Sequence, residues 1–376
     1  MDTAALKSSF AKVATYGDQV PLFFYSYLFV AYPETRDLFP ASMAGQRDRL
    51  VAALGRVVSN VDNTDGLVEL LQQLGRDHRK FGAVAEHYPA VGEALLATLA
   101  HFLEGDWTSR LAAEWKAAFG VIAEVMTKAA DDMARVTPPW WDAEVLQHER
   151  RSIDIAVVQV RPHTELDYVP GQSLAVESSL RPRVWRYYSP ANAPRDNGTI
   201  ELHVRLVEGG QVSAALVQSL RPGDHLRLGS PVGNRLVLDP DDRSDLLLLA
   251  GGTGLAPLRA LVEQVALEGG RRRVSLYVGA RMTHHLYDLP ALSRLEQSYS
   301  WLTVVPAVSD DPTYQGDRGH LVDVALKQGS WTDHQVYVCG SPIMVAGTLD
   351  RLGAAGISPS AVHFEDFGRS EGGGLA

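Results

Sequence analysis

A glycine-rich turn in the second half of the chain is the first feature whose residue types suggest chemistry. Gly252, Gly254 and Pro257 follow an apolar run and stand where a helix would begin. Glycines let a backbone approach a pyrophosphate closely, and the first N–H groups of a helix attract anions. Proline suits the first helical turn because no N–H is needed there. On its own, an ordinary strand-to-helix turn explains the pattern equally well.

Residues before this turn offer groups suited to a flavin nucleotide. Arg186 carries a guanidinium that can grip a diphosphate with two donors. Tyr188 offers an aromatic face for a ring system, and Ser189 offers a hydroxyl donor for its edge. Val212 and Ser213 offer backbone and hydroxyl donors for phosphate. For Tyr188 taken singly, aromatic core packing is the simpler explanation.

Cys339 is the only cysteine in the chain. This count excludes an internal disulfide, a cysteine-ligated iron–sulfur cluster and a cysteine-ligated structural zinc. A lone cysteine is commonly a small buried apolar residue. Its place at the end of a predicted strand, directly before Gly340, favours a position near the nucleotide over a nucleophilic role.

The N-terminal third contains three histidines that could bind a metal: His78, His87 and His101. His78 ends an amphipathic segment, and His87 begins the next one. On chemistry alone, a single histidine among helices is more often a surface residue or a satisfied core residue than a ligand.

The elements that must position these residues change along the chain. Residues 1–137 have helical periodicity, which predicts an all-helical domain. Two prolines then predict a linker over 138–150. Short apolar runs between glycine and proline turns predict an antiparallel β-barrel over 151–240. Strands alternating with helices predict an α/β domain with a parallel sheet over 241–368, and the glycine-rich residues 369–376 form a flexible tail.

The composition excludes several classes of protein. The 376 residues carry a net charge of −10 and are 45% hydrophobic, which is typical of a globular chain with more than one domain. No basic patch stands out, so nucleic acid and anionic membranes are poor partners. Residues 1–10 lack the layout of a signal peptide, and residues 246–250 are too few to span a bilayer. We expect a cytoplasmic monomer that binds small molecules and has no transmembrane segment.

The order of the motifs is similar to that of the ferredoxin-reductase-like flavoproteins, over roughly residues 151–368. The resemblance implies an FAD site and an NAD(P)H site. The implied FAD contacts are Arg186, Tyr188, Ser189, Gly210, Gln211, Val212 and Ser213, with Phe367 over the other flavin face. The implied NAD(P)H contacts are Gly252, Thr253, Gly254, Pro257, Cys339 and Gly340.

The helical third resembles the globin domain of bacterial flavohaemoglobins, and the three-part order matches that family over nearly the whole chain. The matching segments are 22–29, 32–40, 46–50, 78 and 87–93. The resemblance implies haem b with His78 as the proximal iron ligand and Tyr88 in the network around it. It makes Tyr25 and Gln46 a distal hydrogen-bonding pair, Leu50 a distal apolar wall, and Phe39 the ring packed on the haem.

The residue types agree with these roles. Gln46 and Leu50 are four residues apart and therefore share one face of a helix. A phenol and an amide in an apolar pocket can stabilise the negative charge on O2 held at a haem. The simpler alternatives are that the Tyr25 hydroxyl faces water and that Gln46 is a surface amide.

Two positions depart from the family. The glutamate that the family places near its proximal histidine falls at Ala130, with the shorter Asp131 beside it. The residue before His78 is Asp77, where the family usually has lysine. Haem binding is therefore better supported than the family's full catalytic rate.

The resemblance implies a nitric oxide dioxygenase with a role in nitrosative stress: electrons pass from NAD(P)H through FAD to haem iron, which binds O2 and oxidises NO to nitrate. Two alternatives stay open, an O2- or redox-sensing globin kept ferrous by its own reductase, and an NAD(P)H–flavin reductase for an external acceptor. The choice of NADH or NADPH also stays open. Arg281 could bind a 2′-phosphate, whereas Asp288 could favour a free ribose.

Overall fold

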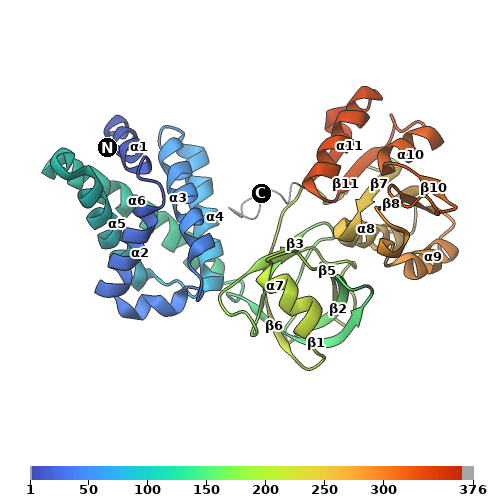
Figure 1. Cartoon of the computed structure of the whole chain (residues 1–376), viewed down its shortest axis with the longest axis horizontal. Helices are drawn as coiled ribbons and strands as arrows, with labels where there is room; N and C mark the ends of the chain where they lie inside the picture. Colours follow the sequence, from blue (N-terminus) through green and yellow to red (C-terminus); the bar gives the residue numbers. More distant parts are fainter. Residues whose placement is uncertain (1, 366–376) are drawn as a thin grey trace. The chain divides into compact units, whose positions relative to one another are not determined.

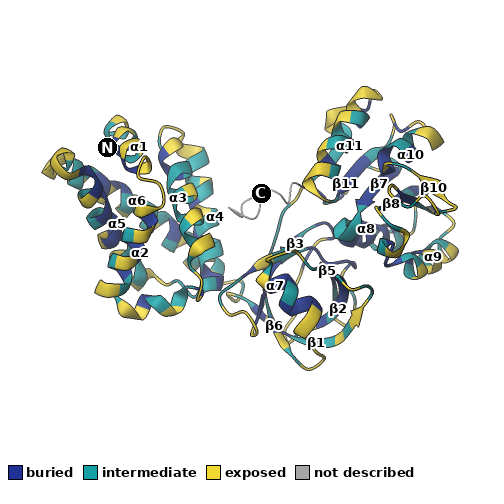
Figure 2. Cartoon of the chain, viewed as in Figure 1, coloured by how far each residue is buried: buried dark blue, intermediate teal, exposed yellow. Residues whose placement is uncertain are grey.

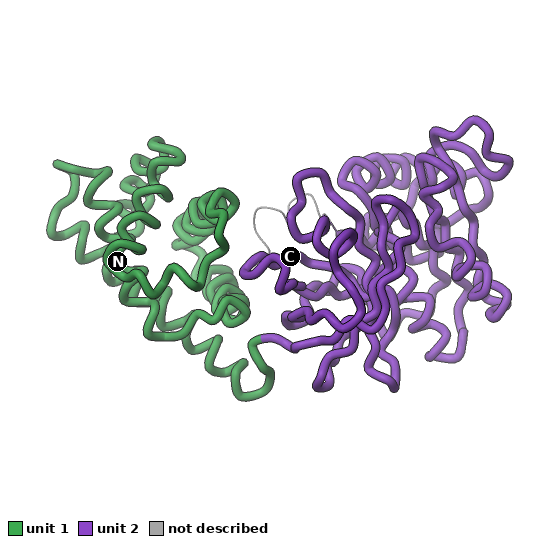
Figure 3. Tube along the Cα trace, turned by 60° about the horizontal axis from the view of Figure 1, so that its bottom comes forward, with its two compact units in different colours: residues 1–139, 369–375 green, residues 140–368, 376 purple. Residues whose placement is uncertain are grey.

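The computed structural model describes residues 2–365. The chain divides into two compact units, the first ending at Pro139 and the second beginning at Trp140 (Figure 3). Each unit has its own hydrophobic core. No described helix is long and apolar enough to cross a membrane.

The described residues of the first unit form helices and no strands (Figure 1). Its α-helices are α1 (Thr3–Ala14), α2 (Gln19–Ala31), α3 (Ala44–Ser59), α4 (Thr64–His78), α5 (Tyr88–Leu103) and α6 (Ser109–Ala134). Short 3-10 segments are η1 (Pro33–Leu38), η2 (Arg79–Phe81), η3 (Ala85–His87) and η4 (Glu104–Asp106).

Local signals set where these helices begin. The side chains of Asp2, Asn63 and Thr108 each accept a hydrogen bond from a first-turn N–H, which satisfies a donor without an intrahelical partner. The main core of the unit includes Leu28, Leu99, Leu103 and Trp115. A second, smaller cluster joins Val57 of α3, Leu71 of α4 and Met126 of α6. The all-helical first domain predicted from periodicity is confirmed.

Helices α4 and α6 approach each other very closely. A Cβ at Gly75 of α4 would clash with the backbone carbonyl of Met126 in α6, so only glycine allows this approach. One turn past Gly75, the Arg79 guanidinium donates to the Thr137 hydroxyl at 3.0 Å, just after α6. These two contacts hold the end of α4, where His78 lies.

The second unit begins with an antiparallel sheet in the order β4-β3-β6-β1-β2-β5. A bridge between Pro190 and Leu202 links the end of β4 to β5 and nearly closes the sheet into a barrel. The strands are β1 (Trp141–Arg150), β2 (Ile155–Pro162), β3 (Ser173–Ser178), β4 (Arg186–Tyr188), β5 (Ile200–Arg205) and β6 (His225–Val232). The helix α7 (Gln211–Ala214) continues into the π-helical η5 (Ala215–Ser219).

The structure differs from the linker expected over 138–150. From Trp141 the chain is strand β1, which pairs with both β2 and β6. Trp141, Ala143 and Val145 are buried and alternate with the charged Asp142 and Glu144 on the other side. The alternation was missed because it directly follows two prolines, which by themselves predict a connection rather than a strand.

The rest of the second unit is a parallel sheet in the order β10-β9-β8-β7-β11-β12. Its strands are β7 (Leu246–Gly251), β8 (Val274–Ala280), β9 (Leu302–Val308), β10 (Asp317–Arg318), β11 (Gln335–Cys339) and β12 (Val362–Phe364). The helical elements are η6 (Gly252–Gly254), α8 (Leu255–Leu267), η7 (Thr283–His285), α9 (Leu289–Ser298), α10 (Leu321–Gln328), α11 (Pro342–Ala354) and η8 (Pro359–Ala361).

Helices cover both faces of this sheet, whose strands are largely buried (Figure 2). Leu246 and Leu248 pack with α8 and α9, whereas Leu247 and Leu249 pack with α10 and α11. The predicted fold class, helices followed by an antiparallel barrel and then a parallel α/β sheet, is confirmed.

Candidate functional site

His78, the last residue of α4, is oriented by a backbone carbonyl. Its Nδ1 lies 2.7 Å from the Leu74 carbonyl oxygen, which can only accept, so Nδ1 carries the proton. Burial lowers the pKa of the imidazole, so the ring is neutral at neutral pH. No described residue hydrogen-bonds to Nε2, which leaves its lone pair available. These features fit a haem ligand, whose second nitrogen is normally held in this way.

Two positions near His78 in the sequence, Asp77 and Ala130, depart from the family pattern, and the structure shows where they lie. Asp131 is exposed on α6, and Ala130 carries no carboxylate that could accept from the ring. Asp77 forms an ion pair with Lys80 at 3.4 Å. The backbone carbonyl of Leu74 is therefore the acceptor for the His78 ring, and it partly offsets the lowering of the pKa by burial.

The predicted distal pair meets in the structure. Tyr25 in α2 is 5% exposed, and its hydroxyl donates to the backbone carbonyl of Gln46 over a long 3.5 Å. Burial raises the pKa of Tyr25 to about 12, so the phenol keeps its proton at neutral pH. The Gln46 side-chain oxygen accepts from Arg49 Nη2 at 3.0 Å, which leaves its amide N–H groups as donors.

Phe39 and Leu50 complete this side. Phe39 packs edge-on against Tyr25 with 5.4 Å between ring centroids, and Leu50 lies one turn after Gln46 on α3. Tyr25, Phe39 and Leu50 belong to one apolar cluster of the first unit. Gln46 borders this cluster through its hydrogen bond with Tyr25. Tyr88 packs instead against a second cluster that includes Leu71 of α4, and burial raises the pKa of its phenol. Tyr25 and Tyr88 thus belong to different clusters of the helical unit.

The candidate flavin residues lie at β4 and the following turn. Arg186 is exposed and donates to the neighbouring Trp185 carbonyl at 2.9 Å. No other residue of the described part of the chain accepts from it, so its remaining donors can meet a diphosphate. Burial raises the pKa of Tyr188. The Ser189 hydroxyl lies 2.9 Å from that of Ser173 in β3, a partner that the sequence pattern did not reveal.

The phosphate turn around Gly210 differs in detail from the expectation. Gly210 precedes α7, so the first-turn N–H groups of Gln211 and Val212 have no intrahelical acceptor. The Ser213 hydroxyl accepts from the Val207 N–H at 3.1 Å and donates to the Gly210 carbonyl at 3.2 Å. The Ser213 hydroxyl is therefore used within the turn, which it stabilises. The backbone N–H groups of Gln211 and Val212 are the better donors to a phosphate.

The glycine turn lies at the carboxyl ends of β7 and β11, the two strands between which the strand order reverses. Such a switch point is where parallel α/β sheets bind ligands. Gly252 has a φ of +57°, and a Cβ at Gly254 would clash with the Cys339 carbonyl oxygen. Thr253 lies between these glycines, and Pro257 falls in the first turn of α8.

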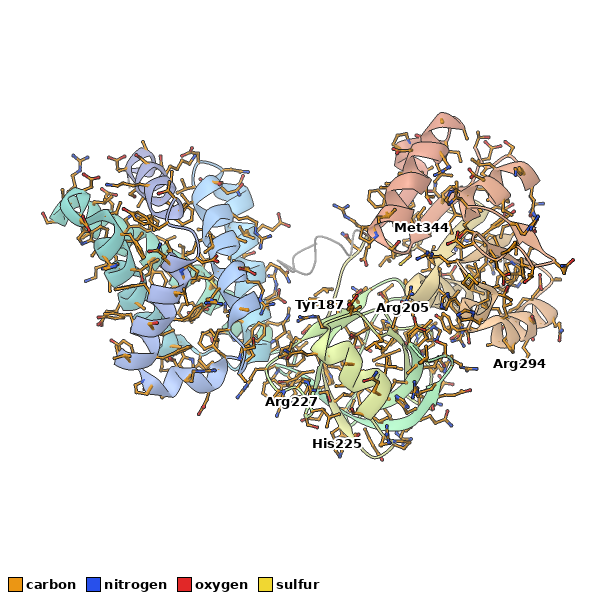
Figure 4. All side chains as sticks on the ribbon, viewed as in Figure 1. Tyr187, Arg205, His225, Arg227, Arg294 and Met344 are labelled. Atoms are coloured by element: carbon orange, nitrogen blue, oxygen red, sulfur yellow. The ribbon has the colours of Figure 1, made fainter. Side chains whose placement is uncertain are left out.

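Two further side chains border the glycine turn (Figure 4). A Cβ at Gly252 would lie 3.6 Å from Nη1 of Arg205, at the end of β5. A Cβ at Gly251 would lie 3.2 Å from Sδ of Met344 in α11. The turn thus combines an open backbone with a nearby cation, as a pyrophosphate site requires.

Cys339 ends β11 directly before Gly340 and is 1% exposed. Burial strongly raises the pKa of its thiol, with a smaller effect of Glu365, so the sulfur is a neutral group. Glu365 is itself buried, and burial raises its pKa to about 7. Sequence reasoning missed Glu365, which lies two residues before Phe367. The predicted flavin contact Phe367 lies outside the described residues.

The two residues weighed for NADH or NADPH have different positions. Asp288 is 2% exposed and faces Arg259 and Arg151 at 3.8 and 4.0 Å, so it cannot meet a ribose. Arg281 is exposed after β8, and its Nε pairs with Asp310 after β9 at 2.8 Å. The described residues contain no group of three or more histidine, cysteine or acidic side chains that could hold a metal ion.

Three family models match successive parts of the chain: a globin over residues 22–126, an oxidoreductase FAD-binding domain over 142–236 and an oxidoreductase NAD-binding domain over 248–350. The chain is thus a globin joined to an FAD- and NAD-binding oxidoreductase module.

Relatives extend this match to the full length. A flavohemoprotein from Bacillus subtilis is 25% identical, with 96% of both chains covered. A phenol 2-monooxygenase reductase component, DmpP, from a Pseudomonas species is 31% identical over 60% of this chain and 68% of its own. The solved flavohemoglobin of Malassezia yamatoensis, with bound FAD and heme, has a TM-score of 0.76 at 17% identity, with 97% and 98% covered.

The chain belongs to the flavohaemoglobin family. It is an NAD(P)H-dependent oxidoreductase whose cofactors are haem and FAD.

Proposed function

We propose that this flavohaemoglobin is a nitric oxide dioxygenase that uses NAD(P)H and O2 to convert NO into nitrate. The observation that carries the proposal is the pairing of the buried Tyr25 hydroxyl with Gln46, in the same helical unit as a neutral His78 with an available Nε2. The fused reductase module supports a continuous electron supply. A cytoplasmic, monomeric protein is part of the same proposal.

The reaction balances as one electron per nitrate: NO, O2 and one electron give one nitrate ion. One NAD(P)H therefore supports two nitrates and releases one proton. When bound, haem supplies the site for O2 and one-electron chemistry, and FAD divides the hydride into single electrons.

The helical unit positions the reactants. Because burial raises its pKa, the Tyr25 phenol keeps its proton at neutral pH and remains a hydrogen-bond donor. The surrounding apolar cluster excludes water and so strengthens any hydrogen bond that the phenol donates. The Gln46 amide adds a second donor, and Leu50 limits the space beside them. On the other side, the Leu74 carbonyl fixes the tautomer and direction of His78.

The reductase unit binds and orients the two nucleotides. Arg186 and the N–H groups of Gln211 and Val212 hold the flavin diphosphate, while Tyr188 and Ser189 meet the ring. The glycine turn at Gly252 holds the dinucleotide. Cys339 closes the nucleotide site as a neutral, buried group.

The experiment supplies the purified protein, loaded with haem and FAD, with NADH or NADPH, O2 and NO. Nitrate formation at two per nucleotide oxidised supports the proposal. The 31% identity of the reductase half to an oxygenase reductase component is the observation behind the alternative of an external acceptor. Nucleotide oxidation that reduces an added protein or dye but yields no nitrate would establish that alternative. A stable oxygenated spectrum without turnover would indicate a sensor.

A further inference from the structure

Buried charged side chains join strand β5 of the barrel to helix α8 of the α/β part. Leu202 and Val204 of β5 pack in the barrel core. Side chains of a strand alternate between its two faces, so Glu201 and His203 point away from that core. Arg259 of α8 is 8% exposed, pairs with the Glu201 carboxylate and places Nη1 3.4 Å from Nε2 of His203. An arginine of the nucleotide-binding part is thus held by two residues of the flavin-binding part.

Two further contacts cross the same boundary. The Glu263 carboxylate, one turn further along α8, accepts from Nη2 of Arg195 at 2.9 Å and from the Ala193 N–H at 3.2 Å. The hydroxyl of Tyr287, shortly before α9, lies 2.7 Å from Nδ1 of His203. Ala193 and Arg195 belong to the connection between β4 and β5, so each of these contacts joins a barrel residue to a residue of the α/β part.

The pair at the centre of this cluster is fully charged. Burial acts to raise the pKa of Glu201, but the hydrogen bond with His203 and the charge of Arg259 lower it to about 2. Replacement of a buried ion pair by apolar side chains is often neutral or even stabilising. The pair is therefore better explained by the single arrangement that it imposes on its neighbours than by a contribution to stability.

The cluster also contains polar atoms that make it less stable. Nε of Arg259 and Oδ2 of Asp288 are buried 3.8 Å apart, and neither forms a hydrogen bond with a described residue. A buried polar atom without a hydrogen bond costs free energy. This cost again points to a role in positioning.

The face of β5 that carries the cluster leads to the glycine turn. Arg205 lies two residues after His203, and a Cβ at Gly252 would lie 3.6 Å from its Nη1. Helix α8 begins at Leu255, directly after the glycine turn, and Arg259 lies in its second turn. The cluster thus holds the start of the helix whose N-terminus is the candidate dinucleotide site.

We propose that Arg259, Glu201 and His203 are positioning residues for hydride transfer, because they fix the dinucleotide-binding turn against β5 of the flavin-binding barrel. The step moves a hydride, with two electrons, from NAD(P)H to FAD and gives NAD(P)+ and the two-electron-reduced flavin anion. Reacting atoms must lie about 3–3.5 Å apart, and a misplacement of about 1 Å can cost roughly a hundredfold in rate. The proposal concerns this transfer and does not rest on the reaction proposed at the haem.

The first test removes the central pair from the full chain loaded with haem and FAD. Arg259→Met alone leaves a buried carboxylate without its arginine and should lower stability. The double variant, Arg259→Met with Glu201→Met, removes both charges and should keep a free energy of unfolding close to that of the wild type. Stopped-flow reduction of the flavin by NADH without O2 separates affinity from rate. In the double variant the rate at saturating NADH should fall about tenfold or more, whereas the NADH concentration at half-saturation should change less than about twofold.

The second test measures the order of the elements themselves and needs no turnover. Amide hydrogen exchange is followed by mass spectrometry on the protein with haem and FAD but without dinucleotide. Residues 200–205 and 252–260 should exchange several-fold faster in the double variant than in the wild type, and exchange in β7 should be unchanged. A role in stability alone would instead raise exchange throughout the second unit.

Two further variants serve as controls. Arg243→Met removes an exposed arginine that pairs at 3.4 Å with Glu268, directly after α8, and it should change neither the rate nor the exchange. Arg259→Lys keeps the charge and should recover much of the rate that Arg259→Met loses. An unchanged rate of flavin reduction in the double variant would overturn the proposal. Weaker NADH binding with an unchanged rate at saturation, or exchange that rises equally throughout the second unit, would overturn it as well.

Discussion

Nδ1 of His78 lies 2.7 Å from the carbonyl oxygen of Leu74, one turn earlier on the same helix. Because a carbonyl can only accept, this contact fixes the proton on Nδ1 and directs Nε2 away from its own helix. The close approach of α4 to α6 at Gly75 makes the position rigid. The His78 ring is thus oriented by a backbone atom, and burial favours its neutral form.

Replacement of His78 should remove haem from the first unit and leave FAD in the second. His78→Ala should purify with FAD but with little haem, because its Nε2 is the assigned iron ligand. NADH-driven reduction of a dye should continue, since the second unit has its own cores. His101→Ala is the matched control, because His101 stacks on Phe23 at 4.2 Å and has no assigned ligand role. A normal ferrous haem spectrum in His78→Ala would refute the assignment.

Loss of the Tyr25 hydroxyl should shorten the lifetime of the oxygenated protein. If the phenol donates to O2, Tyr25→Phe removes a hydrogen bond to a partly charged acceptor, worth about 1.5–3 kcal/mol. The O2 dissociation rate should then rise roughly ten- to a hundredfold, as stopped flow can measure. Tyr27→Phe, on the same helix but bonded to Glu93 at 3.0 Å, should leave the rate unchanged. Equal rates in both variants would place the Tyr25 phenol elsewhere.

Removal of Arg186 should weaken FAD binding. Its guanidinium is exposed and engages only a neighbouring carbonyl, so it is available for a diphosphate. Losing a partner of a bound anion costs about 2–5 kcal/mol, so Arg186→Ala should release FAD on gel filtration. Arg181 is also exposed and bonded to its neighbour's carbonyl, and Arg181→Ala should keep its flavin. Equal flavin content in the two variants contradicts the assignment.

The choice of dinucleotide should depend on Asp310. The Asp310 carboxylate pairs with Arg281 at 2.8 Å. This ion pair engages the guanidinium that a 2′-phosphate would need. The wild type should therefore favour NADH, and Asp310→Ala should lower KM for NADPH several-fold with little change for NADH. The double variant with Arg281→Ala should lose that gain. An unchanged KM for NADPH in Asp310→Ala would exclude Arg281 as the phosphate partner.

The helices, the barrel and the α/β sheet were predictable because periodicity and turn residues are local signals. Strand β1 was not, because its alternation of Trp141, Ala143 and Val145 with charges directly follows two prolines. Asp288 was misleading for a different reason. Its partners Arg151 and Arg259 are distant in the sequence, and only folding shows that its carboxylate is buried among them.

The candidate site shows the same limit. Tyr25, Gln46 and Phe39 come from separate segments, and their proximity followed from family resemblance rather than spacing. The Ser173 hydroxyl beside Ser189 and the occupied hydroxyl of Ser213 depend on side-chain directions that no sequence pattern encodes. Glu365 is one acidic residue among many in the sequence, and only its burial singles it out.

The last prediction concerns the pH dependence of stability at Glu365. Burial raises its pKa from 4.5 in the unfolded chain to about 7 in the folded one. The folded state thus binds the proton more tightly, so this contribution is fully present below about pH 4.5 and is lost as the pH rises through about 7. The loss amounts to roughly 3 kcal/mol.

Glu365→Gln keeps the shape of the side chain and removes its titration. The free energy of unfolding of the reductase unit, measured by urea titration of the full chain, should fall between about pH 5 and about pH 8 in the wild type by more than in Glu365→Gln. Glu208→Gln, at an exposed position, should behave as the wild type. A pH profile shared by all three proteins would mean that Glu365 ionises freely and that the carboxylate is not buried beside Cys339 in solution.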